Sequence, residues 1–285
     1  MVLVRIMDEA TRDIEEALVA HWSHLGRWSR GALTDVRGAL CYETPIPHLP
    51  YNGVIRTHLS TAGADDAIAA VVDSFHRRGV RFLWWQHPTC TPADLGQRLE
   101  AHGLTPVEHA TGMSIELDGW NWEALRPGVG YEEVLSDRAM KQYEELIVSY
   151  WGLPSESQAL VADLNRFWGP GRLPAHRWLA FVDGCPVGKA LLSLAGSPGV
   201  AAVYGMSVRP EARGMGIARG LTSTLLRRAQ ELGCHRVVLH SSELAVPVYL
   251  KSGFAKRCSL TVYATGSLWS SEGTNADLPA SRAET

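Results

Sequence analysis

The sequence predicts an α/β (α+β) fold, because strand-like and helix-like segments alternate along its 285 residues and one order of elements occurs twice. In the second half, an apolar, β-branched run at 200–208 precedes an amphipathic segment at 217–232. A short strand at 235–240 and a helix at 243–252 follow, and a strand at 258–264 completes the order. This half therefore predicts a strand–helix–strand–helix–strand unit.

The first half has a similar order of elements. A strand-like segment at 51–59 precedes a helix with apolar residues on one face, then a strand at 80–85, a second helix and a last strand near 112–117. The repeat predicts four parts: a domain at 1–118, a Gly- and Pro-containing linker at 119–130, a second domain at 131–265 and a flexible tail at 266–285.

Composition and charge exclude several classes of function. A net charge of −3 gives no electrostatic reason to expect nucleic acid as a partner. No stretch approaches the roughly 20 apolar residues that cross a bilayer, and no targeting segment is visible, so we expect a cytoplasmic protein without a membrane partner. The cysteines form no C-x-x-C pair, and the pairs His21/His24 and His235/His240 lack companions at metal-ligand spacing. We therefore expect no metal.

A glycine-containing turn lies between the strand at 200–208 and the helix that follows it. Its residues are Arg213, Gly214, Met215, Gly216, Ile217 and Ala218. Unpaired amides and the positive end of the helix dipole meet at such a point, which suits a phosphate held by main chain. Two common nucleotide motifs do not fit. Arg219 stands where G-x-G-x-x-G needs its third glycine, and 184–190 has one residue too few for a phosphate-binding loop.

A second motif follows at 245–254, with the sequence Ala-Val-Pro-Val-Tyr-Leu-Lys-Ser-Gly-Phe. The pattern Arg-x-x-Gly-x-Ala and this segment, in this order, resemble the GNAT superfamily of acyl-CoA N-acetyltransferases. The resemblance implies that each half has a mixed, mostly antiparallel central sheet flanked by helices. It also implies that residues 213–218 wrap the coenzyme A pyrophosphate and that Tyr249 faces the thioester sulfur. A phenol with a pKa of about 10 is protonated at neutral pH, so Tyr249 is the candidate acid.

The same resemblance assigns a role to the strand at 200–208, which precedes residues 213–218. Gly205 is compatible with the bulged strand that GNAT proteins open for the pantetheine. The resemblance places Met206, Ser207 and Val208 along the acyl carbonyl and the pantetheine arm, with the amides of Met206 and Val208 as donors.

The first half differs from the second where the cofactor would bind. Asp65 and Asp66 stand near the start of its helix, where they suit the helix amides but repel a pyrophosphate. Alignment of Leu99 with Leu250 puts Arg98 where the second half has Tyr249. We therefore expect a degenerate GNAT-like domain without a working cofactor site.

The predicted activity is transfer of an acetyl group from acetyl-CoA to a primary amine of a small molecule or peptide, by direct attack. The general base stays open: Glu156, Asp163 and Glu243 are candidates by location only, and a water chain is an alternative. Ser241-Ser242 replaces an asparagine often found before the tyrosine helix. Two alternatives keep the fold: a non-catalytic acyl-CoA-binding module, and an enzyme that acylates oxygen or uses a longer acyl donor. The residues set neither the acceptor nor the oligomeric state.

Overall fold

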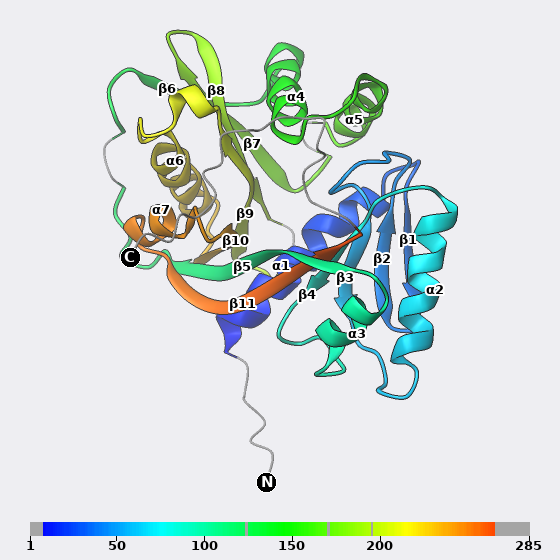
Figure 1. Cartoon of the computed structure of the whole chain (residues 1–285). Coiled ribbons are helices and arrows are strands. Elements are labelled where there is room, and N and C mark those ends of the chain that lie inside the picture. The colour runs from blue at the N-terminus through cyan, green and yellow to red at the C-terminus, as the bar shows by residue number, and fades with distance from the viewer. Residues whose placement is uncertain (1–7, 123–124, 170–171, 195, 266–285) are drawn as a thin grey trace, which may run out of the picture.

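The computed structural model describes residues 8–122, 125–169, 172–194 and 196–265 (Figure 1). Its helices are α1 (Glu9–Gly26), α2 (Ala64–Arg77), α3 (Leu95–Ala101), α4 (Asp137–Trp151), α5 (Ser155–Phe167), α6 (Ile217–Glu231), α7 (Val246–Lys251) and a 3-10 turn, η1 (Pro210–Ala212). Among these residues no helix combines the length and the apolar character needed to cross a bilayer. The predicted tail at 266–285 lies outside the described residues.

The strands form one continuous sheet. They are β1 (Ala32–Val36), β2 (Ala39–Glu43), β3 (Gly53–Thr57), β4 (Leu83–Gln86), β5 (Thr105–Glu116), β6 (Val129–Glu133), β7 (Ala175–Val182), β8 (Cys185–Ser193), β9 (Val200–Val208), β10 (Arg236–Ser242) and β11 (Ala255–Ala264). Their order across the sheet is β1-β2-β3-β4-β11-β5-β10-β9-β8-β7-β6. Each half contributes one parallel pair, β3 with β4 and β9 with β10, and the other pairs of named strands are antiparallel. This confirms the predicted fold class.

The two halves repeat one unit, as the order of elements shows. In the first half β3, α2, β4, α3 and β5 follow one another, and in the second half β9, α6, β10, α7 and β11 do. In each unit a helix joins the two parallel strands, which is how parallel neighbours must be connected. Elements α1, β1, β2, β6 and α5 were not predicted, because their segments carry no clear motif in the sequence.

The last strand of each half lies in the other half's part of the sheet. β11 pairs with β4, with Val262 opposite Trp85, and β5 pairs with β10, with Met113 opposite Leu239. β5 and β11 also pair with each other. The sheet therefore runs unbroken between the two halves, although the domain limits at 118 and 131 themselves stay a prediction.

Helices cover both faces of the second half's strands. On β9, Ala201 and Val203 pack with the core beneath α6, whereas Ala202 and Tyr204 pack against Ile14 of α1. Figure 1 shows α6 and α7 on one side of these strands and α1, α4 and α5 on the other. We call the second side the α1/α4 face. The first helix of the chain therefore builds a wall of the second half.

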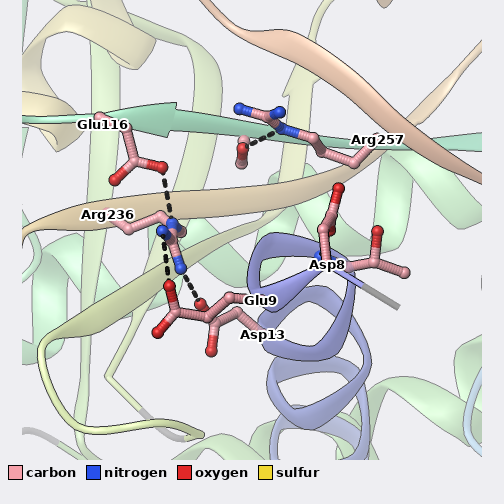
Figure 2. A network of polar contacts seen from close by, with 8 residues as sticks. Asp8, Glu9, Asp13, Glu116, Arg236 and Arg257 are labelled. Carbon is pink, nitrogen blue, oxygen red and sulfur yellow. Dashed lines mark hydrogen bonds and ion pairs between the residues drawn. The ribbon is translucent and has the colours of Figure 1, made fainter. Parts of the chain in front are cut away.

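An ion-pair network fastens α1 to β10 and β5 (Figure 2). Arg236 Nε donates to Glu116 at 2.7 Å, and the same guanidinium pairs with Asp13 and, at 3.3 Å, with Glu9. The side chains of Arg236 and Asp13 are only 11% and 7% exposed. A buried carboxylate needs such a partner, because an unpaired charge in the interior is costly. The contact between the halves is thus partly ionic.

Candidate active site

β9 and β10 separate part-way along their length. They pair in parallel only as far as Val203 and Leu239. Beyond that point β9 continues with β8 alone and β10 with β5 alone. Gly205 sits at the divergence with φ +59°, a left-handed conformation that glycine adopts without penalty, and the β8–β9 register shifts beside it. We call the region between these two separated strand edges the opening.

The start of α6 lies next to this opening. Gly216 is the N-cap of α6, and no side chain hydrogen-bonds to the first amides of the helix. Gly214 and Gly216 have φ values of +77° and +78°, and no atom outside their chain neighbours lies within 4 Å of the place where their Cβ atoms would be. The amides and the helix dipole therefore face open space. A helix start of this kind suits an anion, and we call residues 213–218 the cradle.

The predicted cofactor residues lie along this edge of the molecule. Met206, Ser207 and Val208 are half-buried on β9 just beyond the bulge, and η1 follows them. In the cradle Arg213, Gly214 and Gly216 are exposed, Met215 and Ala218 are half-buried, and Ile217 is buried in the core.

Tyr249 lies on α7, on the α6 side of the sheet. Its side chain is 5% exposed and packs in the core beneath α6, with its ring centroid 5.6 Å from that of Phe254. Burial raises the pKa of the phenol well above its usual value, and nearby Tyr150 raises it further. The hydroxyl is therefore protonated at neutral pH, which a proton donor requires.

On the α1/α4 face, Lys189 lies at the bulge of β9. It stands opposite Ser207 in the β8–β9 pairing, and its Nζ donates to the Gly205 carbonyl at 2.7 Å. The rings of Tyr143 and Tyr150 on α4 lie 5.4 and 5.9 Å from Nζ. Lys189 was not among the predicted site residues, since nothing around position 189 in the sequence indicates that it is buried or which residues it contacts.

The family of this half is decided by comparison with known proteins. Residues 140–254 match the sequence model of the acetyltransferase (GNAT) family. The C-terminal half belongs to the GNAT family. The opening in the sheet and the cradle both lie within the matched residues, so the match covers the candidate site. This confirms the resemblance that the two sequence motifs indicated.

Similar proteins extend the comparison to both halves. A mycothiol acetyltransferase from Cellulomonas flavigena is 24% identical over 269 residues, which is 78% of this chain and 76% of that protein. One from Paenarthrobacter aurescens is 37% identical over 62 residues, 21% of this chain and 19% of that protein. These named relatives and the family match make the chain an acyltransferase.

Solved structures show the same fold. A GCN5-related N-acetyltransferase from Kribbella flavida has a TM-score of 0.68 at 17% identity, covering 90% of this chain and 96% of that one. A tandem GNAT protein from the clavulanic acid biosynthesis pathway has a TM-score of 0.59 at 16% identity, covering 92% and 96%. These likenesses show that the fold of both structures extends over most of this chain.

Two further residues lie at the GNAT site without a local sequence signal. Arg126, from the segment predicted as a linker, donates to the Met215 carbonyl at 3.0 Å and so places a cation beside the cradle. Tyr150 reaches from α4 toward the opening. Its pKa is raised by burial and by Glu108 and lowered by Arg213, so it lies within electrostatic reach of the cradle.

The three carboxylates proposed from the sequence as bases lie elsewhere or face solvent. Glu156 and Glu243 are exposed, and Asp163 pairs with Arg30 at 3.7 Å and with Arg166 at 3.6 Å. The described residues contain no group of His, Cys, Asp and Glu side chains arranged to hold a metal ion.

Proposed function

We propose that this chain transfers an acetyl group from acetyl-CoA to a primary amine of a small molecule. One observation carries the proposal: the opening between β9 and β10 lies directly beside an uncapped helix start with open left-handed glycines. An acyl-CoA has a pyrophosphate for the second feature and a narrow pantetheine arm for the first.

Different residues of the chain bind different parts of acetyl-CoA. Amides of residues 213–218 hold the pyrophosphate, with Arg126 beside them, and the backbone at Met206, Ser207 and Val208 lines the pantetheine. Tyr249 supplies the proton for the sulfur. When bound, acetyl-CoA provides the activated thioester. We place the acceptor on the α1/α4 face, where the Lys189 side chain lies beside the exposed Gly205.

The curated relatives suggest a first acceptor to test. Both are named mycothiol acetyltransferases, so mycothiol without its acetyl group comes first, followed by amino sugars, amino acids, polyamines and peptides with free N-termini.

The test combines binding and turnover on the full chain. Isothermal titration with acetyl-CoA should give saturable binding, and mass spectrometry of reactions with the acceptor panel should find one product that is heavier by an acetyl group. A protein that does not bind acetyl-CoA contradicts the proposal outright. Binding without a product from any amine indicates an acyl-CoA-binding module instead.

Replacement of Tyr249 by Phe tests the proton donor. The ring and its packing against Phe254 stay, and only the hydroxyl is lost. We expect turnover to fall about 100-fold, the lower end of general-acid contributions, with acetyl-CoA affinity unchanged within about threefold. Unchanged turnover would reduce Tyr249 to a packing residue.

A further inference from the structure

Lys189 is a buried cation without a carboxylate partner among the described residues. Lys189 lies in the middle of β8 and is only 3% exposed. The described ion pairs include none to Lys189, and its one hydrogen bond is to the carbonyl of Gly205. Lysine is almost never buried without a pair, so a specific reason is needed.

The position of its amine is informative. If Gly205 carried a Cβ, only two atoms beyond its chain neighbours would lie within 4 Å of it: Lys189 Nζ at 3.4 Å and the Tyr143 hydroxyl at 3.8 Å. Gly205 itself is exposed and marks the start of the opening. A group that enters beside Gly205 on the α1/α4 face therefore meets the lysine amine first.

Burial of this amine favours loss of its proton. Burial lowers the pKa of Lys189 to about 8. The groups that face Nζ are the neutral phenols of Tyr143 and Tyr150 on α4 and, on β9, the Gly205 carbonyl. Three charged groups act on these phenols: Arg177 of β7 acts on Tyr143, and Glu108 of β5 and Arg213 of the cradle act on Tyr150. Both enzyme forms, ammonium and free amine, are thus accessible near neutral pH.

We propose that Lys189 is the proton acceptor of the acetyl transfer, taking a proton from the ammonium form of the acceptor at the opening between β9 and β10. This inference rests on the function proposed above and supplies the base that the sequence leaves open. After it has taken the proton, the Lys189 ammonium keeps its hydrogen bond to the Gly205 carbonyl. It also lies near the rings of Tyr143 and Tyr150, which stabilise a cation.

The protons and bonds balance as follows. One proton passes from the acceptor ammonium to Lys189 Nζ, which frees the nitrogen lone pair. That lone pair forms the C–N bond with the acetyl carbon, and the C–S bond breaks. Tyr249 gives its proton to the sulfur and regains one from the new amide nitrogen. Lys189 finally releases its proton to solvent, so the net products are the amide, the free thiol and one proton.

A purely structural role for Lys189 would have a different signature. If the lysine only ties down the bulge, any cation that donates to the Gly205 carbonyl suffices. Arginine keeps the charge and the donors but cannot give up its proton in a protein. Lys189→Arg therefore separates a base from a tether, and Lys189→Met removes both functions at similar length.

The first measurement needs no turnover. The chain has lysine only at 141, 189, 251 and 256, so the side-chain signals of 13C-lysine are few, and comparison with Lys189→Met assigns the signal of Lys189. We expect this signal to titrate with a midpoint near pH 8. A midpoint above pH 10 overturns the proposal, because the amine would then not be free at neutral pH.

The second measurement is the pH profile of kcat with acetyl-CoA and the acceptor that the panel identifies. In the wild type the rate should rise through the midpoint seen by NMR. Both Lys189→Met and Lys189→Arg should lose about 100- to 1000-fold in kcat with acetyl-CoA affinity kept within about threefold. Full activity of Lys189→Arg overturns the role as base.

Glu108 provides the competing assignment and therefore the matched control. Its carboxyl is half-buried, and burial raises its pKa. Glu108→Gln should keep the inflection of the pH profile. If this variant abolishes the inflection, Glu108 is the base and the Lys189 proposal is wrong. A wild-type protein that binds no acetyl-CoA overturns both the proposed function and this inference, whereas an active wild type with an active Lys189→Arg overturns this inference alone.

Discussion

The N-termini of α6 and α2 occupy corresponding places in the two halves but differ in charge. At α6 no acidic residue lies in the first turn and no side chain caps the helix. At α2 Asp65 and Asp66 lie in the first turn. Asp65 Oδ2 lies 2.5 Å from Arg98 Nη1, and its other oxygen lies 3.4 Å from His102 Nε2. The start of α6 therefore faces open space, whereas Asp65 at the start of α2 pairs with side chains of its own half.

The comparison teaches that the same strand–helix–strand unit can have either an open helix start or one whose carboxylates pair with nearby side chains. Both helices join parallel strands, and both dipoles place partial positive charge at the same point of the unit. In the first half Arg98 of α3, which stands where α7 has Tyr249, reaches back to the helix start and pairs with Asp65. In the first half, side chains therefore pair with one another at the helix start that the second half leaves uncapped.

The largest effect is expected when a carboxylate is introduced at the start of α6, as α2 already has in its first turn. In Gly216→Asp a carboxylate would stand within about 4 Å of a bound pyrophosphate, a repulsion of about 4 kcal/mol at an effective dielectric constant of 20. We expect the dissociation constant for acetyl-CoA, measured by isothermal titration, to rise about 1000-fold.

Two variants control this result. Gly216→Asn tolerates the left-handed conformation without adding charge, so it should lose at most about tenfold. Gly63→Asp makes the matching change at the N-cap of α2, where φ is −103° and no left-handed conformation is needed, and should leave acetyl-CoA binding unchanged. Equal losses in both Gly216 variants would mean that backbone strain, not charge, governs the cradle.

The next effect concerns how far the two halves depend on each other. Arg236→Leu leaves Asp13 of α1 buried without a cation, and loss of one member of a buried pair costs about 3 kcal/mol. Urea unfolding should show this loss in a single transition, since the sheet runs through both halves. The exposed Arg257, which donates to Ser114, is the control, and Arg257→Leu should cost about 1 kcal/mol or less. Two separate transitions would show that the halves unfold independently.

Whether a feature could be predicted depends on how far apart in the sequence the residues that form it lie. The order of elements, the cradle at 213–218 and Tyr249 were predicted because each depends on residues close together in the sequence. The exchange of β5 and β11 was not predicted, because pairing across more than a hundred residues leaves no local pattern. Lys189 was missed for the same reason: its burial comes from tyrosines on a helix far away in the sequence.

Acid should weaken the contact between the halves, where several histidines are held neutral. Burial lowers the pKa of His24 and His87 to about 4 and of His240 to about 3, against 6.5 when unfolded. Their contribution is fully present above pH 6.5 and is lost as the pH falls below it, since the unfolded chain then binds more protons. Each histidine should account for about 1 kcal/mol of stability between pH 6.5 and 5.5.

The measurement is urea unfolding at pH 7.0 and 5.5. His240→Phe keeps a ring beside Trp85 but cannot titrate, so its loss between the two pH values should be about 1 kcal/mol smaller than that of the wild type. His76 is exposed on α2, and His76→Gln should lose as much as the wild type. An unchanged pH dependence in His240→Phe would place the acid sensitivity elsewhere.

The smallest effect is expected from neutralising the first-half helix start. Asp65→Asn removes one charge from α2 and weakens the exposed pairs with Arg98 and His102, which contribute at most about 1 kcal/mol. The change does not restore the cradle, because Asp66 stays and α2 has Gly63 in place of an open left-handed turn. Titration calorimetry should still find one acetyl-CoA per chain with affinity within about twofold of the wild type. Binding of two molecules per chain would show that the Asp65 carboxylate alone had blocked a site in the first half. The backbones of the two helix starts would then differ less than the conformations of Gly63 and Gly216 indicate.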